Sequence, residues 1–392
     1  MHSNRADAMK IFVTGLRGIP RVMGGIESHC EELLPRIKSA NNDFDINVLC
    51  RAPYVDAERR TFESIVLTPL PAPRSRSFEA IVATFVATLY AWFKKANVLH
   101  IHGIGPALMT PLARILGLKV IVTHHGADYE RAKWGAMAKM ILRVGERSGL
   151  IWAHRVIAIS PSLANHLREI FPSQAHKVSY IPNGTPKLPS DGVDSAEVHA
   201  ALGLTGKKYA IAVGRLVPEK GLHDLIEAFQ SAELGADWVL AIAGDADHDS
   251  EYARELRAHE SERIRFLGFQ TRPVLKCLYE NCALFVMPSY HEGLPIAALE
   301  AASCEAPMLL SDIEANRDLG LGEDCYFPVG DVERLSGLLA TNHKARSSDS
   351  RTVKKRFDWD AAAFKTAALY RSVSAIPNDT VSIARSASRS AK

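Results

Sequence analysis

Short apolar runs alternate with helical segments through the second half of the chain. Runs of this length, rich in Val, Ile, Leu and Ala, are typical of strands buried on both faces of a parallel sheet. Their alternation with helices predicts a doubly wound α/β domain. The segments are, in order, 209–214, 222–229, 238–244, 252–260, 264–268, 274–280 and 283–288.

The last of these runs leads into a candidate phosphate site. Gly293, Leu294 and Pro295 follow it, and an alanine-rich helix is expected to begin near Gly293. The free N–H groups of a helix start attract anions, and glycine lets a phosphate approach the backbone. Glu292 lies just before this start, and Glu300 lies about 10 Å along the helix, roughly the distance from a diphosphate to a ribose.

A second polar turn, after the apolar run Tyr209–Val213, supplies two cations. Gly214 ends the run, and Arg215 and Lys220 follow. Arginine makes bidentate bonds to phosphate oxygens, and lysine adds a compact charge. Such a pair would stabilise the negative charge that builds on a departing diphosphate. The two motifs together predict a nucleotide-sugar site, although either alone is more often a solvated turn.

GRLVPEKG at 214–221 and HEGLPIAALEA at 291–301 resemble the donor half of glycosyltransferase family 4, retaining enzymes of the GT-B fold. The resemblance covers roughly residues 9–375 and, through GLRGIP, GGIE and VTHHGADYERAKWG, extends to a rhamnosyltransferase-like subgroup. It implies two facing doubly wound Rossmann-like domains with parallel sheets and a C-terminal cross-over helix. With a boundary in the Pro- and Gly-rich segment 181–194, the domains would be 1–185 with 360–375, and 186–359.

The resemblance also implies roles for individual residues. Arg215 and Lys220 would hold the donor diphosphate, Glu292 the donor sugar and Glu300 the ribose. A histidine that ends the apolar run 118–126 would face the donor sugar, and alignment on the following glycine selects His125 rather than His124. The catalytic candidates are therefore His125, Arg215, Lys220 and Glu292, and the donor-binding candidates are Gly24, Gly25, Gly214, Gly293, Leu294 and Glu300.

The first half of the chain offers a glycine pair and a further histidine pair. Gly24 and Gly25 precede a helix expected to begin near Ile26, where glycines bring N–H groups close to a phosphate or sugar. A plain turn is the alternative. His100 and His102 end another strand and share one face of it. They either line the cleft or are hydrogen-bonded within the strand end.

The implied reaction moves a hexosyl or deoxyhexosyl group from a nucleoside diphosphate sugar to a glycan, with retention and without a metal or cofactor. The subgroup implies an acceptor on polyprenyl diphosphate. Asp128 and Arg131 are candidate contacts to it, with plain surface charge as the alternative. Asp245 and Asp247 match a metal motif by letters but are interpreted as a loop. The donor stays open, because Glu300 favours UDP or GDP, whose ribose has both hydroxyls, whereas the subgroup favours deoxythymidine diphosphate.

Cysteine spacing and hydropathy indicate the compartment. The six cysteines form no Cys-x-x-Cys pair or zinc spacing, which predicts reduced, mostly buried thiols and a cytoplasmic protein. Whether the chain starts at Met1 or Met9, no signal-length apolar run follows. The helical stretch Ile81–Phe93 is too short to span a bilayer and is expected to pack on a sheet. A membrane-surface role, helped by Lys94 and Lys95, is the alternative.

Positive charge gathers near the C-terminus. Residues 341–392 hold 11 Lys and Arg against 4 Asp, a formal +7. The segment 376–392 is rich in Ser, Ala and Arg and is predicted to be disordered. It is either a solvated tail or one that attracts anionic lipid. No nucleic-acid motif accompanies the charge. The resemblance implies a nucleotide sugar and its acceptor as partners, and peripheral contact at the inner face of the membrane is left open as an alternative to a purely cytoplasmic protein.

Two rival functions stay open. A nucleotide-sugar epimerase of the same fold would turn over its sugar nucleotide without an acceptor. A non-catalytic protein would bind nucleotide sugar without turnover.

Overall fold

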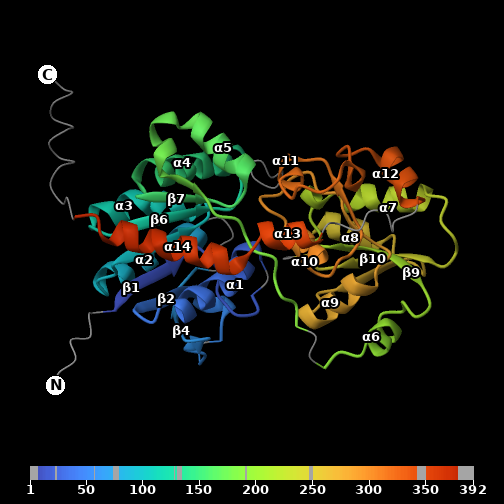
Figure 1. The fold of residues 1–392 in the computed structure, drawn as a ribbon, viewed down its shortest axis with the longest axis horizontal. Coiled ribbons are helices and arrows are strands. Elements are labelled where there is room, and N and C mark those ends of the chain that lie inside the picture. Colours follow the sequence, from blue (N-terminus) through green and yellow to red (C-terminus); the bar gives the residue numbers. More distant parts are fainter. Residues whose placement is uncertain are drawn as a thin grey trace. The chain divides into compact units, whose positions relative to one another are not determined.

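A computed structural model gives the fold of the protein, shown in Figure 1. It describes residues 8–22, 24–56, 58–73, 79–127, 129, 135–189, 192–246, 250–341 and 350–377. The chain divides into two compact units, Met1–Pro182 with Trp359–Lys392 and Asn183–Asp358. These bounds differ by a few residues from the domain limits that the sequence predicts.

An eight-stranded sheet forms the centre of the first unit. Its order is β3-β4-β2-β1-β5-β6-β7-β8, and the short β3 pairs antiparallel with β4 while the other neighbours are parallel. Continuous apolar runs fit these strands because both faces are covered by helices. The strands are β1 Met9–Thr14, β2 Phe44–Arg51, β3 Thr61–Phe62, β4 Ile65–Leu70, β5 Val98–His102, β6 Lys119–His124, β7 Arg155–Ala158 and β8 Val178–Tyr180.

Helices cover both faces of this sheet. One face packs against α1 (Gly25–Ala40) and α14 (Trp359–Ser374), which lie side by side in Figure 1. The other face packs against a second layer of helices. That layer contains α2 (Glu79–Phe93), α3 (Thr110–Ile115), α4 (Ala136–Trp152) and α5 (Pro161–Ile170), with the short helices η1 (Ala52–Tyr54), η2 (Pro106–Met109) and η4 (Pro172–Lys177) between elements.

The last helix, α14, brings the end of the described chain back to the first unit. Tyr370 is fully buried, and its hydroxyl lies 2.7 Å from Nδ1 of His100 in β5. Arg371 forms an ion pair with Asp43 at 2.7 Å and stacks on the Phe44 ring. The helix therefore closes the core between α1 and the sheet.

The second unit has a six-stranded parallel sheet in the order β11-β10-β9-β12-β13-β14. Counted from β9, this is the 3-2-1-4-5-6 order of the dinucleotide-binding fold. The strand order reverses between β9 and β12, which are hydrogen-bonded neighbours. The strands are β9 Lys208–Val213, β10 Trp238–Ala243, β11 Ile264–Gly268, β12 Leu284–Met287, β13 Met308–Ser311 and β14 Tyr326–Phe327.

The helices of the second unit separate these strands, and the parallel doubly wound architecture predicted from the sequence is confirmed. They are α6 Ser195–Ala201, η5 Pro218–Lys220, α7 Leu222–Ser231, α8 Glu251–Arg257, α9 Arg272–Asn281, α10 Ile296–Ser303, α11 Glu314–Arg317, η6 Glu323–Cys325, α12 Val332–Leu339 and α13 Ser350–Arg356.

Two further expectations concern thiols and membrane spans. The six cysteines all lie in described segments, none is bridged, and five are buried, as the spacing predicts. None of the described helices combines the length and the apolar character needed to cross a bilayer.

Candidate active site

The two donor motifs lie at the point where the second sheet reverses its strand order. Gly214 and Arg215 directly follow β9, and Ser289 and Glu292 follow β12. In open α/β sheets, ligands bind outside the carboxyl ends of the strands at this switch point. The fold thus brings together two segments that the sequence places far apart.

Lys220 and Glu292 are in direct contact. Lys220 Nζ lies 2.5 Å from Glu292 Oε1, and Ser289 Oγ donates to the same oxygen at 2.8 Å. The two charged side chains are 21% and 11% exposed, so water screens the pair only in part. Ser289 was not anticipated from the sequence, although its place directly after β12 was a usable signal.

Gly221 explains why the turn that carries Lys220 fits so closely against β12. Its φ is +62°, and a Cβ at this position would lie 2.2 Å from the carbonyl oxygen of Pro288. The backbone N–H of Tyr290 donates to the carbonyl of Glu219 at 2.9 Å, which fixes the two turns together. Only glycine combines this backbone conformation with this approach.

The helix after β12 begins later than the sequence predicts. α10 starts at Ile296 rather than near Gly293, because Pro295 is extended (φ −76°, ψ 105°) and occupies the N-cap. Gly293 and Leu294 therefore lie in the turn before the helix, where Leu294 is buried. Glu300 lies four residues into α10, about 6 Å along its axis, instead of about 10 Å.

Glu300 has a defined partner of its own. It is 8% exposed, and the hydroxyl of Tyr279 on α9 donates to its Oε2 at 3.1 Å. Burial, followed by the Glu300 carboxylate, raises the pKa of Tyr279 well above its usual value, so the phenol stays protonated and keeps donating. Arg215 is partly buried at the end of β9. The structure thus pairs Lys220 with Glu292, and Glu300 with Tyr279.

A further contact stiffens the turn after β12. The hydroxyl of Tyr290 donates to Asp224 of α7 at 2.5 Å, and the His223 ring stacks on Tyr290 with 15° between planes. Nothing in the sequence pattern marked these residues, because the contact depends on the packing of α7 beside β12.

In the first unit, the glycine pair lies at the start of α1. Gly24 is the N-cap with φ +153°, and a Cβ there would lie 2.0 Å from Glu27 Oε2 and 2.7 Å from the Arg17 guanidinium. Glu27 also accepts from the backbone N–H of Arg17 at 2.9 Å. Gly24 thus leaves room for the ion pair between Arg17 Nε and Glu27 Oε1 at 3.2 Å, and its positive φ favours glycine, whereas a Cβ on Gly25 would meet open space.

His124 and His125 at the end of β6 have different surroundings. Gly126 N–H donates to His124 Nδ1 at 3.2 Å, which leaves Nε2–H of His124 to donate to Glu146 at 2.8 Å. His124 is thus fixed against α4. His125 lies one residue beyond the strand and turns instead toward His102, with 3.0 Å between His125 Nε2 and His102 Nδ1.

The histidines around His125 form a neutral cluster. His100 is held between Tyr370 and Thr123, each at 2.7 Å, and burial lowers its pKa to about 3. Burial also lowers the pKa of His102 and His125 well below the usual 6.5, and the neighbouring rings add to the effect. His100 is therefore a structural residue, whereas His102 orients the candidate His125.

The tautomers of this pair follow from the hydrogen-bond inventory. His102 Nε2 is buried and has no hydrogen-bond partner among the described residues. A buried N–H without an acceptor is rarer than an unsatisfied acceptor, so we assign the proton to Nδ1 of His102. That proton is donated to His125 Nε2, which leaves Nδ1–H as the remaining donor of the His125 ring.

His29 of α1, which the sequence analysis did not single out, packs its ring against those of His102 and His125. Within the described residues, His29, His102 and His125 place ligand nitrogens within 4.8 Å of one another. A tetrahedral zinc ion needs nitrogens about 3.3 Å apart. The bond between His102 and His125 would have to break first, so the present arrangement is that of a hydrogen-bonded cluster.

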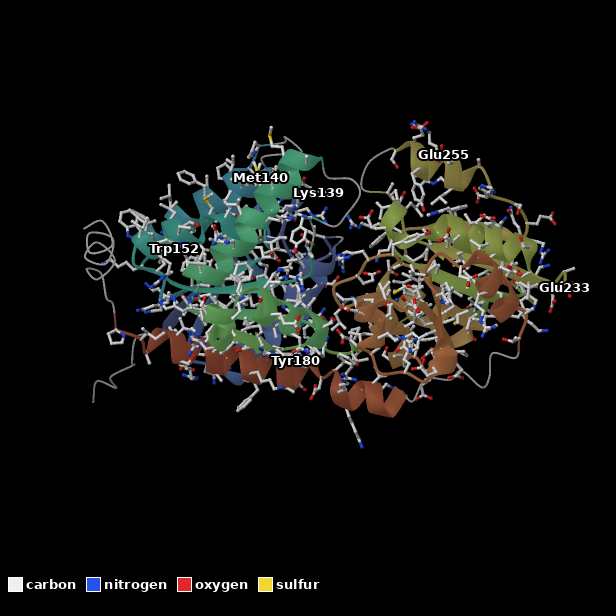
Figure 2. The ribbon with its side chains drawn as sticks, turned by 90° about the horizontal axis from the view of Figure 1, so that it is seen from above. Lys139, Met140, Trp152, Tyr180, Glu233 and Glu255 are labelled. Carbon is white, nitrogen blue, oxygen red and sulfur yellow. The ribbon has the colours of Figure 1, made fainter. Side chains whose placement is uncertain are left out.

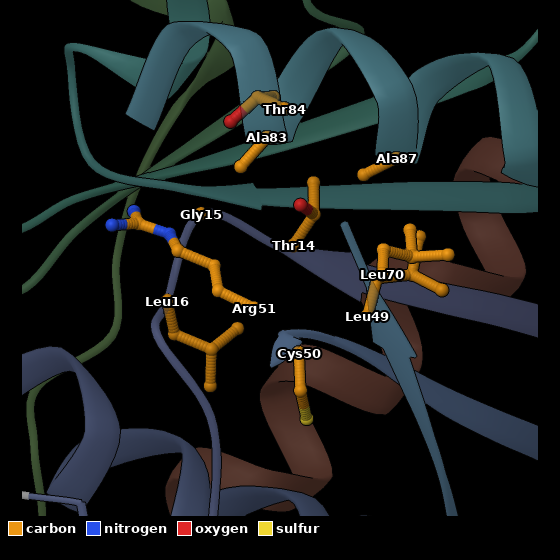
Figure 3. Close-up of a pocket in the computed structure, with 10 residues that line it drawn as sticks. All are labelled: Thr14, Gly15, Leu16, Leu49, Cys50, Arg51, Leu70, Ala83, Thr84 and Ala87. Carbon is orange, nitrogen blue, oxygen red and sulfur yellow. The ribbon is translucent and has the colours of Figure 1, made fainter. Parts of the chain in front are cut away.

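A small pocket opens where β1, β2 and β4 end against α2 (Figure 3). It has about 230 Å³ of empty space, part of it open to solvent. Ala83, Thr84 and Ala87 of α2 lie over the strand ends that carry Thr14 and Gly15. The remaining lining residues are Leu16, Leu49, Cys50, Arg51 and Leu70.

The candidate acceptor contacts Asp128 and Arg131 lie outside the described residues, as do Asp247 and segment 378–392.

Comparisons with known proteins match both units. Residues 23–186 match the family described as Glycosyltransferase Family 4, and residues 194–340 match Glycosyl transferases group 1. The chain is 28% identical over 339 residues to an alpha-maltose-1-phosphate synthase of Mycobacterium tuberculosis, covering 78% of this chain and 87% of the relative. It is 28% identical over 309 residues to an Escherichia coli UDP-Gal:alpha-D-GlcNAc-diphosphoundecaprenol alpha-1,3-galactosyltransferase, covering 74% and 75%.

The fold has close counterparts among solved structures. Sucrose-phosphate synthase from Thermosynechococcus elongatus superposes with a TM-score of 0.78 at 20% identity, covering 93% of this chain and 99% of that one.

Proposed function

Since the chain has the GT-B fold and carries a glycosyltransferase family 4 domain followed by a group 1 domain, we propose that it is a retaining, metal-independent hexosyltransferase of the rhamnosyltransferase-like subgroup. It would move a hexosyl or deoxyhexosyl group from a nucleoside diphosphate sugar to a glycan or lipid-linked glycan in cell-surface polysaccharide synthesis. The observation that carries the proposal is the contact between Lys220 and Glu292 at the switch point of the second sheet.

The donor diphosphate would lie at the start of α10. Its anionic oxygens would meet the free N–H groups of the helix start, the Lys220 ammonium and the Arg215 guanidinium. Gly214 and Gly293 would leave room for the phosphates. Glu300, held by Tyr279, would accept hydrogen bonds from the ribose hydroxyls.

Lys220 would act mainly as the glycosidic bond breaks. Without donor, the Glu292 carboxylate balances the ammonium. As the sugar leaves, negative charge grows on the diphosphate and attracts Lys220 and Arg215 more strongly in the transition state than in the ground state. Glu292 keeps the lysine in place and would contact the donor sugar. The acceptor hydroxyl would attack from the same face, giving its proton to the leaving phosphate.

The role proposed for His125 is to donate a hydrogen bond to the donor sugar through Nδ1–H. Its depressed pKa keeps the ring neutral at physiological pH, so it would serve as a hydrogen-bond donor rather than as an acid. The bond from His102 would fix this tautomer.

UDP is the donor nucleotide that we propose to test first. Glu300 gains most from a ribose with two hydroxyls, and the galactosyltransferase relative uses a UDP sugar according to its name. By its name, that relative also acts on a diphosphoundecaprenol-linked sugar, which supports a lipid-linked acceptor.

A thermal-shift panel tests the proposal. UDP, GDP, ADP and deoxythymidine diphosphate sugars are each added to the full chain, and a ligand at about 100 times its Kd should add about 2.7 kcal/mol of stability. The donor that binds is then incubated with and without a polyprenyl diphosphate-linked glycan. Transfer only with the acceptor supports the transferase. Turnover without acceptor would show an epimerase, and binding without turnover a non-catalytic protein.

A further inference from the structure

We propose that the outer surface of α2, α3 and α4 in the first unit docks on an anionic lipid bilayer. The proposed function includes a lipid-linked acceptor, and this inference rests on that proposal. It identifies the surface through which the protein would contact the membrane. It does not depend on which donor the protein uses.

Helix α2 presents an apolar stripe to solvent. Its inward face, with Thr84, Ala87, Thr88 and Ala91, is buried against the sheet. The outward positions follow at helical spacing, and all of them are apolar. They are Val82 (39% exposed), Phe85 (44%), Leu89 (37%), Trp92 (50%) and Phe93 (74%). The sequence predicted that this helix packs on a sheet, and only one of its faces does so.

The stripe continues across neighbouring helices. α2 and α4 both pack against η2, and α3 contacts both of them, so the three helices share one surface. Exposed apolar side chains on this surface are Ile115 of α3 (73%) and Met137 (72%), Met140 (60%) and Val144 (48%) of α4. Figure 2 shows Met140 and Lys139 projecting from the outer side of α4. Apolar side chains gathered over adjoining elements in this way mark an interaction site.

Among the described residues of these helices and of the turn after α2, the exposed charges are positive. Lys94 and Lys95 are exposed directly after α2, and Arg143 and Arg147 are exposed on α4. The carboxylates of the three helices are occupied internally. Glu79 pairs with Arg51, and Glu146 is buried against His124 and Tyr129.

This combination of groups fits a bilayer better than it fits a second copy of the chain. Two copies joined through this surface would place cations opposite cations. An anionic bilayer instead offers phosphates to the lysines and arginines, and hydrocarbon to the apolar side chains. Trp92 and Phe93, beside the two lysines, are residue types suited to the level of the headgroups.

The placement of α2 also suits a lipid-linked acceptor. Ala83, Thr84 and Ala87 of the same helix line the pocket in Figure 3, so the helix has the pocket on one side and the apolar stripe on the other. A glycan that emerges from the bilayer beside α2 would be one helix diameter from that pocket.

Sedimentation of the full chain with vesicles tests the inference. One set contains phosphatidylcholine alone, and the other also contains phosphatidylglycerol. The wild-type protein should bind only the anionic set. The triple variant Phe85→Ser, Trp92→Ser and Phe93→Ser, and separately the double variant Lys94→Glu and Lys95→Glu, should each bind at least about tenfold more weakly. The matched controls are Phe364→Ser, 77% exposed on α14, and Lys365→Glu beside it, which should bind like the wild type.

The outcomes distinguish failure of the docking proposal from failure of the proposed transferase function. Each variant is also melted with and without the donor found above, so that loss of folding is recognised. If the wild type does not bind vesicles, or if the triple variant binds as well as the wild type, the proposed docking surface is wrong. Neither result bears on the proposed transferase activity. A concentration-dependent dimer that the triple variant abolishes, without vesicle binding, would also overturn the docking surface. Vesicle binding by a wild type that transfers no sugar would instead contradict the proposed function.

Discussion

Lys220 Nζ and Glu292 Oε1 lie 2.5 Å apart although 72 residues separate them in the chain. The contact exists because β9 and β12 are adjacent and each ends in a turn that carries one partner. Each side chain is mostly shielded from water, so each depends on the other for its orientation.

Replacing either partner should abolish most activity. Lys220→Ala removes a cation whose attraction to the diphosphate grows as the diphosphate leaves. Glu292→Gln removes the carboxylate that holds this cation in place. Either variant is expected to lower kcat at least about a hundredfold. Lys208→Ala, at a 65% exposed lysine paired with Asp237 in the same unit, is the control. Near-normal turnover of a folded Lys220→Ala variant would refute the assigned role.

Gly221→Ala should be far more harmful than Gly206→Ala. Both glycines have positive φ, +62° and +69°, but a Cβ on Gly221 meets the Pro288 carbonyl, whereas one on Gly206 meets nothing within 4 Å. The pair separates steric conflict from backbone strain. Gly221→Ala is expected to cost about 2 kcal/mol more in unfolding free energy and to weaken donor binding. Equal costs in urea unfolding would show that the two turns do not need this close approach.

Tyr279→Phe should raise the donor KM about tenfold and leave kcat nearly unchanged. The variant removes the hydrogen bond that holds Glu300, a bond to a charged acceptor. Since the ribose takes no part in bond breaking, the loss falls on binding in both ground and transition states. Tyr252→Phe, which loses a contact with His223, is the matched control. A fall in kcat at constant KM would contradict a ribose role for Glu300.

Stability should fall as pH falls below 6.5. Burial lowers the folded-state pKa of His100 to about 3 and of His154 to about 4, so the unfolded chain takes up protons that the folded chain does not. Each such histidine should lower the free energy of unfolding by about 2 kcal/mol at pH 5. Melting curves should show His154→Gln losing less stability between pH 7.5 and 5 than the wild type. His176→Gln, at an exposed position in the same unit, should keep the wild-type dependence.

Strand positions were predictable because both sheets are covered on two faces. Tyr209–Val213 and the run that contains β12 are continuous apolar stretches, and such stretches form few other structures when turns bound them. The start of α10 was less certain, because proline suits both the N-cap and the first helical turn. In the structure Pro295 has an extended ψ, because the preceding turn buries Leu294 in the core.

The internal contacts of the candidate site were not predictable. The sequence marked Lys220 and Glu292 as ligands of a common donor, but their direct bond depends on the strand order. His29 was missed because a buried histidine on a helix has no local signature. The exposed face of helix α2 was not predictable for another reason. It is apolar all round, and such a helix does not reveal which of its faces is covered.

The return of α14 to the first unit sets the order in which the protein can mature on the ribosome. Trp359, Tyr370 and Val373 complete a core whose other members are synthesised first. The nascent first unit must therefore wait, with an apolar face uncovered, until the entire second unit has left the exit tunnel. The half of the chain that is translated earliest is consequently the last to complete its core.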